Sequence, residues 1–413
     1  MDIRTVRAVN SRGDVAYNVM PTGSQWYDVY RNSENVSEWL GPGHTAYYFG
    51  INEAAQVAYG GYAGGWRNFE VFVDRTDWSS AVLNPEITYE LSGGALAENG
   101  MPIWTSLVKG TRVRDLWFGH RRLTEGVSGE YYATFQAVNR RNDVLWLLNG
   151  DVTGWQRQIF LNERNISVPV VGHGAAVGLN AYLNDRGDVA WQAQMWDPQA
   201  GMISHVYVND RNVSREVFGD AAWTVAGPRA INNRGDVAWG AKDVRLGPDY
   251  GSQDVFLNTE NISYPILGDT YHEAGPIALN ERGDLLWGAG YQLFVNSREV
   301  TDVPGRRGLI VDYAGIDEHG RVLWGDGGGW ELERVWVDDV CLTIDVYGDE
   351  WAKYGSSGIQ IGPNGHVLWA SWRLDEPGSV TVWRSTPIPE PGSLPLLLPA
   401  LLLLNRRRRR RAA

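Results

Sequence analysis

The sequence predicts an all-β protein, a β-propeller of four-stranded antiparallel blades. A ten-residue segment recurs nine times, at intervals of 37 to 48 residues. A complete copy holds four short apolar runs bounded by turn residues, as expected for four strands. Two aromatic positions are also filled in all nine copies. A four-stranded unit repeated about every 40 to 45 residues is typical of a propeller blade, because such a unit needs neighbours to cover both of its faces.

The repeated segment is clearest in AINNRGDVAW, from Ala230 to Trp239. The other eight copies begin at Ala8, Gly50, Ala95, Ala137, Tyr182, Ala278, Gly315 and Gln360. The position of Asn232 is filled by Asn10, Asn52, Ala97, Asn139, Asn184, Asn280, Asp317 and Gly362. The ninth copy ends without a fourth strand, and residues 1 to 3 are too few to supply one. We therefore expect eight or nine blades and a chain that begins upstream of Met1.

The seventh copy has the fewest insertions and defines four strands, A to D. Strand A ends at Asn280 and strand B begins at Asp284, while strands C and D lie around Phe294 and Val300. The A-to-B link is Asn-x-x-Gly, in which Asn opens a type I turn and Gly supplies the positive φ of a bulged hairpin.

The C-to-D link is a second tight turn, seen at Asn162 to Asn165, Asn209 to Asn212 and Asn258 to Asn261. In an antiparallel meander both tight turns lie at one end of the blade, here named the turn end. The B-to-C and D-to-A links then share the opposite end, here named the loop end.

Both faces of each unit are predicted to be covered, because strand B carries large apolar residues on one face and small apolar residues on the other. The aromatic position of strand B is filled by Tyr17, Tyr59, Trp104, Trp146, Trp191, Trp239, Trp287, Trp324 and Trp369. The aromatic position of strand C is filled by Tyr30, Phe72, Trp117, Phe160, Tyr207, Phe256, Phe294, Trp336 and Trp383.

Composition narrows the classes of partner. Six of the 37 basic residues are Arg406 to Arg411, which leaves 31 basic against 49 acidic side chains in residues 1 to 405, a net charge of −18. So acidic a body is repelled by phosphate backbones, which argues against a nucleic-acid partner. The single cysteine, Cys341, excludes an intrachain disulfide and a cysteine-rich zinc site.

The C-terminal segment carries three features in order. Pro389, Glu390 and Pro391 come first, an apolar run from Leu394 to Leu404 follows, and Arg406 to Arg411 come last. This order resembles the PEP-CTERM sorting tail of bacterial envelope and surface proteins. The resemblance implies an exosortase-type transpeptidase as a partner and processing at the Pro-Glu-Pro motif. It also implies a surface repeat protein with tandem Asn-x-x-Gly repeats.

The charge distribution of the tail agrees with that resemblance, because arginines stay on the cytoplasmic side of a membrane and leave the preceding chain exported. The apolar run is short for a span and is interrupted by Pro395 and Pro399, so it suits a transient inner-membrane intermediate. We expect a propeller over residues 1–384, a linker over 385–391, a short hydrophobic segment over 392–404 and a basic cytoplasmic tail over 405–413.

Two short motifs are explained by the turns. Arg-Gly-Asp occurs four times, beginning at Arg12, Arg186, Arg234 and Arg282, always at the A-to-B turn. Asn-x-Ser begins at Asn35, Asn165, Asn212 and Asn261, always after the C-to-D turn. The seven histidines show no metal-ligand spacing, and no phosphate loop or dinucleotide motif is present. The sequence thus predicts no catalytic, cofactor or metal residues.

A third set of aromatic residues is predicted to lie in the B-to-C loops, at the loop end. Its members are Trp26, Trp66, Trp155, Trp196, Tyr250, Trp330 and Trp372. Loops on a rigid scaffold carry binding residues, and the alternative is that each aromatic plugs its own blade. We expect an exported, non-catalytic propeller that binds extracellular polysaccharide or a protein partner through these loops. The second hypothesis is an envelope glycoside hydrolase or lyase with its site in the central channel.

Overall fold

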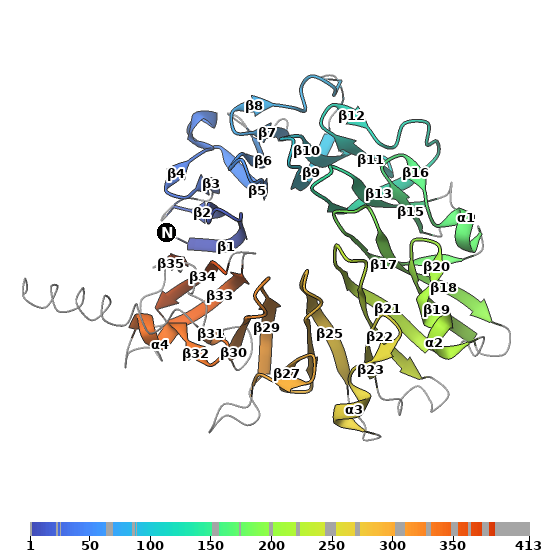
Figure 1. The fold of residues 1–413 in the computed structure, drawn as a ribbon. Coiled ribbons are helices and arrows are strands. Elements are labelled where there is room, and N and C mark those ends of the chain that lie inside the picture. Colours follow the sequence, from blue (N-terminus) through green and yellow to red (C-terminus); the bar gives the residue numbers. More distant parts are fainter. Residues whose placement is uncertain are drawn as a thin grey trace, which may run out of the picture.

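The chain forms a ring of antiparallel β-units, as seen in the computed structural model (Figure 1). The structure describes residues 2–384 except for 22–23, 25, 63–68, 85–86, 88, 151–156, 173–174, 198–200, 220–223, 244–252, 269–272, 302–309, 328–331, 348–353, 362–364 and 374–379. Each of the nine sequence copies forms its own unit, numbered one to nine along the chain. The A strands lie innermost and the short D strands lie at the outside of the ring (Figure 1). This arrangement is a β-propeller, and the predicted fold class is confirmed.

The four strands of the units occur where the repeat places them. The A strands are β1 (Asp2–Val9), β5 (Thr45–Ile51), β9 (Tyr89–Leu96), β13 (Tyr131–Val138), β17 (Ala176–Leu183), β21 (Thr224–Ile231), β25 (Ala274–Leu279), β29 (Ile310–Ile316) and β33 (Tyr354–Ile361). The B strands are β2 (Val15–Met20), β6 (Val57–Tyr62), β10 (Pro102–Val108), β14 (Val144–Gly150), β18 (Val189–Asp197), β22 (Val237–Asp243), β26 (Leu285–Ala289), β30 (Val322–Gly327) and β34 (Val367–Arg373).

The outer half of each unit is shorter. The C strands are β3 (Asp28–Arg31), β7 (Phe69–Val73), β11 (Val113–Phe118), β15 (Gln158–Leu161), β19 (Gly201–Val208), β23 (Gln253–Leu257), β27 (Gln292–Val295), β31 (Leu332–Val337) and β35 (Val380–Arg384). The D strands have two residues each and are β4 (Glu34–Asn35), β8 (Thr76–Asp77), β12 (Arg121–Arg122), β16 (Arg164–Asn165), β20 (Arg211–Asn212), β24 (Glu260–Asn261), β28 (Arg298–Glu299) and β32 (Val340–Cys341).

Hydrogen bonding joins some neighbouring units. Units one, two, five, six and seven each form a separate four-stranded sheet. Units three and four share one sheet, because β11 pairs in parallel with β13. Units eight and nine share another, through a single pair between β31 and β33. The predicted blade number, eight or nine, stays a prediction.

Short helical turns follow five of the D strands. They are the 3-10 helix η1 (Glu38–Leu40) and the helices α1 (Val168–Val171), α2 (Val213–Phe218), α3 (Tyr264–Leu267) and α4 (Leu342–Tyr347). Among the described residues no helix is long and apolar enough to cross a membrane. The predicted linker, hydrophobic segment and basic tail, including Pro389, Glu390 and Pro391, lie outside the described residues.

The Asn-x-Ser motifs stabilise the end of strand D. In unit five, Asn212 caps α2 by accepting a hydrogen bond from the Arg215 amide. The Ser214 hydroxyl then accepts from the backbone amide of Val206 in strand C, over 3.1 Å. Ser37, Ser167 and Ser263 do the same in their units. A buried hydroxyl thus takes the place of a ladder carbonyl where strand D stops, and the predicted turn role of the motif is confirmed.

The predicted positive φ of the A-to-B turn is present in every unit. The position of Gly235, with φ 89°, is filled by glycine in seven units and by Ala55 and Asn142 in the other two. At the C-to-D turn, Asn258 and its equivalents have φ between 51° and 57°. Asn and Asp tolerate this left-handed conformation better than other residues with side chains, which explains their recurrence there.

The two aromatic columns stack on each other across strands B and C. All nine pairs have ring centroids within 4.3 to 6.1 Å, as in Trp239 and Phe256 at 4.3 Å. The indole N–H of Trp239 also donates to the backbone oxygen of Asn258, over 2.7 Å. Each pair therefore contributes apolar burial, and in units one to eight the polar edge of the strand-B aromatic also closes the C-to-D turn.

The ring closes between units one and nine. Strand β1 contacts β33 and β34, and Val15 and Val19 form a buried cluster with Leu368. At the turn end the His366 ring packs against Gly13. The first and last units thus meet through side chains, as other neighbouring units do.

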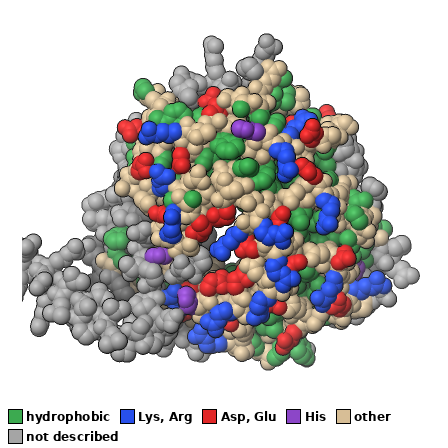
Figure 2. All heavy atoms as spheres, turned by 45° about the horizontal axis from the view of Figure 1, so that its top comes forward, with side chains coloured by type: hydrophobic (Ala, Val, Ile, Leu, Met, Phe, Trp, Pro, Cys, Tyr) green, Lys and Arg blue, Asp and Glu red, His purple; other side chains and the backbone are tan. Residues whose placement is uncertain are grey.

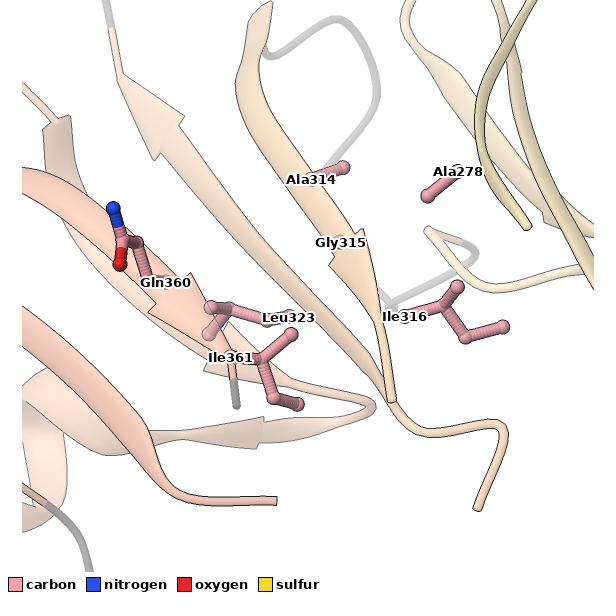
Figure 3. A pocket seen from close by; sticks show the side chains of 7 residues that line it. All are labelled: Ala278, Ala314, Gly315, Ile316, Leu323, Gln360 and Ile361. Atoms are coloured by element: carbon pink, nitrogen blue, oxygen red, sulfur yellow. The ribbon is translucent and has the colours of Figure 1, made fainter. Parts of the chain in front are cut away.

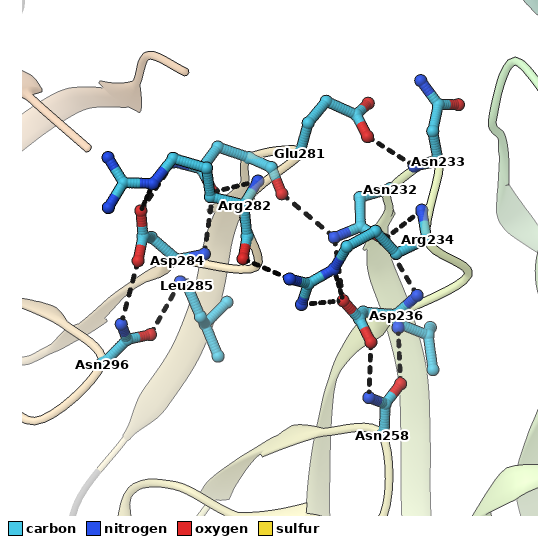
Figure 4. Close-up of polar contacts among 12 residues, drawn as sticks. Asn232, Asn233, Arg234, Asp236, Asn258, Glu281, Arg282, Asp284, Leu285 and Asn296 are labelled. Carbon is cyan, nitrogen blue, oxygen red and sulfur yellow. Dashed lines mark hydrogen bonds and ion pairs between the residues drawn. The ribbon is translucent and has the colours of Figure 1, made fainter. Parts of the chain in front are cut away.

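The A-to-B turns of neighbouring units are linked, as Figure 4 shows for units six and seven. In unit six, Arg234 pairs with Asp236 of its own turn and donates to the backbone oxygen of Arg282 in unit seven, over 2.6 Å. Asn258 of the C-to-D turn donates to Asp236 as well, so both tight turns lie at the turn end. The predicted turn role of the Arg-Gly-Asp motifs is confirmed, and Arg186, Arg234 and Arg282 each add a contact to the next unit.

Candidate functional site: an aromatic surface at the loop end of units one and two

The predicted aromatic loop residues divide into three groups. Trp26 lies in the link before β3 and is half-buried. Trp196 lies within β18 and Trp372 within β34, so their assignment to loops was wrong. The B and C strands of unit five pair over eight residues, which carries Trp196 onto an extended hairpin with 73% of its surface exposed. Trp66, Trp155, Tyr250 and Trp330 lie outside the described residues.

Trp26 lines a pocket of about 430 Å³ at the loop end of unit one. Asp28, Glu38 and His44 contribute its charged side chains. The His44 Nε2 lies 2.7 Å from Asp28 Oδ1, and its Nδ1 lies 2.5 Å from the backbone oxygen of Gly41. Since both ring nitrogens face acceptors, the geometry favours the doubly protonated imidazolium.

The pKa of His44 follows from these contacts. The hydrogen bond to Asp28 raises it most, the Gly41 carbonyl and the Asp28 charge raise it further, and burial lowers it by less than they raise it. The pKa of His44 therefore lies above its ordinary value of 6.5. The pocket thus holds a charged hydrogen-bonded pair beside an indole ring.

A group of five aromatic side chains continues this surface into unit two. It consists of Tyr27, Tyr47, Phe49, Tyr62 and Phe69 and is named the aromatic cluster. Its ring centroids are 5.6 Å apart for Tyr27 and Tyr47, 6.1 Å for Tyr47 and Phe69, 6.3 Å for Phe49 and Phe69, and 5.1 Å for Tyr62 and Phe69. Tyr47 is 43% exposed and the other four are half-buried. The cluster offers a ligand the faces of its aromatic rings and also the hydroxyl groups of its tyrosines.

Two glycines make room for the cluster. A Cβ at Gly60 of β6 would lie 2.1 Å from the Phe69 ring, and a Cβ at Gly93 of β9 would lie 1.9 Å from the Phe49 ring. Neither glycine has a positive φ, so close packing is the reason for glycine here. The two rings can approach the backbone closely because both positions lack side chains.

One carboxylate, that of Glu90, lies close to the aromatic cluster. Burial raises the pKa of Tyr62 most, and the nearby Tyr47 and Glu90 raise it further. Aromatic faces beside acidic hydrogen-bond acceptors can stack on the apolar face of a sugar ring and bind its hydroxyl groups.

The aromatic cluster was not predicted from the sequence. Its residues fall outside the B and C columns, and only Tyr27 adjoins a predicted residue, Trp26. The signal that could have revealed it is the alternation of Tyr47 and Phe49 in strand A opposite Gly60 in strand B. Large residues facing a glycine across a strand pair indicate a packed aromatic surface.

A different pocket bears on the enzyme hypothesis. The inner strands β25, β29 and β33, together with β30, line a pocket of about 310 Å³ (Figure 3). Its lining residues are Ala278, Ala314, Gly315, Ile316, Leu323, Gln360 and Ile361. None of these seven is ionisable, so this pocket does not supply the carboxylate pair that glycoside hydrolysis requires. Among the described residues, no group of three or more His, Cys, Asp or Glu side chains is placed to hold a metal.

Charged side chains gather around the centre of one face of the molecule. Figure 2 shows acidic and basic side chains around a hollow at the centre of the face it presents. Contacts between units involve carboxylates of the A-to-B turns, as where Glu281 of unit seven accepts from the Asn233 amide of unit six over 2.7 Å (Figure 4). These carboxylates are thus engaged by backbone donors of the neighbouring unit.

Comparisons with known proteins add little to the site. No protein-family model and no curated protein matches the chain. Among solved structures, the chain is similar to one described as the structure of the Dos1 propeller. The identity is 9% over 81% of this chain and 91% of that chain, with a TM-score of 0.34. At this identity and score nothing about activity is transferred.

Proposed function

We propose that this protein is an exported, surface-associated β-propeller that binds extracellular polysaccharide, without catalysis, through the loop end of units one and two. The observation that carries the proposal is the aromatic cluster with the adjoining Trp26 pocket. The packed tyrosine and phenylalanine rings form an apolar platform, and the neighbouring Glu90 carboxylate can accept hydrogen bonds from hydroxyl groups. A polysaccharide presents apolar sugar-ring faces and hydroxyl groups in alternation along its length.

Binding to a panel of soluble polysaccharides tests this proposal, measured with the parent protein and the variants Tyr47→Ala and Phe69→Ala. The matched control is Tyr264→Ala, which removes another exposed tyrosine, on α3 of unit six. Loss of either aromatic side chain should lower the affinity at least about tenfold, and the control variant should bind as the parent does. Binding by neither the parent nor the variants, or equal binding by all, would refute the proposal.

The tail supports the exported location. Pro389, Glu390 and Pro391, the apolar run and the terminal arginines together suit an exosortase-type transpeptidase acting at the inner membrane. Mass spectrometry of the protein recovered from a host with such a transpeptidase should show a C-terminus without the arginines. Replacement of the Pro-Glu-Pro residues by alanine should leave the arginines in place. An intact tail in the parent protein would contradict this part of the proposal.

A further inference from the structure

A second pocket lies at the loop end of unit three. It has a volume of about 500 Å³ and is lined by residues of the unit, of the links before and after it, and by Tyr131 of unit four. Leu83 comes from the link that precedes the unit, while Tyr89, Asp115, Trp117 and Arg122 come from the unit itself. We name it the unit-three pocket. It is distinct from the aromatic cluster, with which it shares no residue.

The polar centre of the unit-three pocket is a buried carboxylate. Asp115 is only 8% exposed, and its Oδ1 accepts from the Tyr131 hydroxyl over 2.6 Å and from the Thr124 hydroxyl. Its Oδ2 lies 3.8 Å from Arg122 Nη1, on a side chain that is 41% exposed. The ion pair is therefore long and open to solvent, and it neutralises the carboxylate weakly.

Tyr131 remains a neutral donor to this carboxylate. Burial raises its pKa most, the hydrogen bond to Asp115 and the charge of Asp115 raise it further, and it reaches about 12. The equivalent Asp28 of unit one differs, because His44 lies 2.7 Å from it. Asp254 of unit six resembles Asp115, because it accepts from the Ser263 hydroxyl at the position of Thr124.

The walls of the pocket are aromatic and apolar. Trp117 is half-buried and stacks on Trp104 with ring centroids 5.1 Å apart and an interplanar angle of 7°. Its indole N–H donates to the Ser106 hydroxyl over 2.8 Å, which fixes the ring. Tyr89 and Leu83 also line the pocket. Aromatic faces attract organic cations, and the attraction is strongest where water is excluded.

We infer that the unit-three pocket binds a small organic ammonium compound. Its cationic nitrogen lies at Asp115, and its hydrocarbon part packs against Trp117 and Tyr89. The site offers a fixed negative charge, aromatic faces and apolar walls, which together fit a primary amine attached to an aromatic or aliphatic body. This inference does not rest on polysaccharide binding.

Calorimetric titration with phenethylamine, with phenethyl alcohol as the uncharged counterpart, tests the inference. The parent protein should bind the amine at least about tenfold more tightly than the alcohol. Asp115→Asn keeps an acceptor for Tyr131 and Thr124, so it should fold and lose the preference for the amine. Thermal unfolding of this variant checks that it is folded.

The variant Arg122→Gln gives an independent outcome. Removal of the competing cation should strengthen amine binding several-fold. If the pocket were instead a site for a neutral or anionic ligand, its affinity for that ligand would fall or stay unchanged. Tyr47→Ala should bind the amine as the parent does, which separates this site from the aromatic cluster. Equal binding of amine and alcohol, or of neither at millimolar concentration, would overturn the inference.

Discussion

The side-chain amide of Asn232 donates to the backbone carbonyl oxygen of Asn280 in the next unit, over 3.1 Å. The same amide group donates to Asp236 of its own turn, and the side-chain oxygen accepts from the backbone amides of Arg234 and Asp236. One buried side chain thus shapes its turn and holds the neighbouring unit. The contact recurs from Asn10 to Asn52, from Asn139 to Asn184, from Asn184 to Asn232 and from Asn280 to Asp317.

Replacement of Asn232 by alanine should destabilise the protein by about 2 to 4 kcal/mol, because it leaves several buried backbone groups without partners. Urea unfolding of the parent and the variant measures the difference. The control is Arg234→Ala in the same turn, whose side chain is 54% exposed and whose loss should cost less than about 1 kcal/mol. Equal costs for the two variants would show that the buried amide is not the main link.

Replacement of Ala55 by glycine should stabilise the protein by roughly 0.5 to 1 kcal/mol. Ala55 has φ 60° at a turn position that is glycine in seven units, and a residue with a Cβ pays a conformational cost there. Thermal unfolding should show a higher midpoint for Ala55→Gly. Ala54→Gly, one position earlier and outside the positive-φ region, should lower the midpoint or leave it unchanged. A lower midpoint for Ala55→Gly would contradict the strain argument.

The pH dependence of stability should report on His44. Its folded pKa is raised, chiefly by the hydrogen bond to Asp28, so protonation favours the folded state. The stabilisation is fully present below the unfolded pKa of about 6.5 and is lost as pH rises through the folded pKa. The difference in unfolding free energy between the parent and His44→Gln should therefore be larger at about pH 5.5 than at about pH 8.5. A difference that grows with pH would reverse the assignment.

Local features of the fold could be predicted from the sequence, whereas contacts between units could not. The recurrence of Asn232 and Gly235 predicts a tight turn, because a turn is fixed by bonds within a few residues. The bond from Asn232 to Asn280 depends on how two units stack, which the turn motif does not specify. In unit eight the turn motif likewise fails to predict the contacts. Asp317 replaces the asparagine there, and its carboxylate pairs with the buried Arg321 of the same turn at 2.6 Å.

The sequence predicted the loop end and Trp26, but not the aromatic cluster. The order of strands places the B-to-C and D-to-A links at one end, and Trp26 does lie there. Trp196 was assigned to a loop because hairpin length is not encoded by the repeat, and β18 continues through it. The aromatic cluster depends on the packing of Phe49 against Gly93 of the next unit, a contact between strands that are distant in sequence.

Replacement of Gly60 by alanine should reduce the magnitude of the free energy of polysaccharide binding more than it lowers the free energy of unfolding. A Cβ there would lie 2.1 Å from the Phe69 ring and 2.5 Å from the Phe49 ring, so both rings must move, whereas a Cβ at Gly227 would meet nothing closer than 3.8 Å. Gly227→Ala is therefore the control and should match the parent. Affinity and unfolding free energy are measured on the same samples. If Gly60→Ala binds as the parent does while remaining folded, the arrangement of the aromatic cluster is not what the ligand recognises.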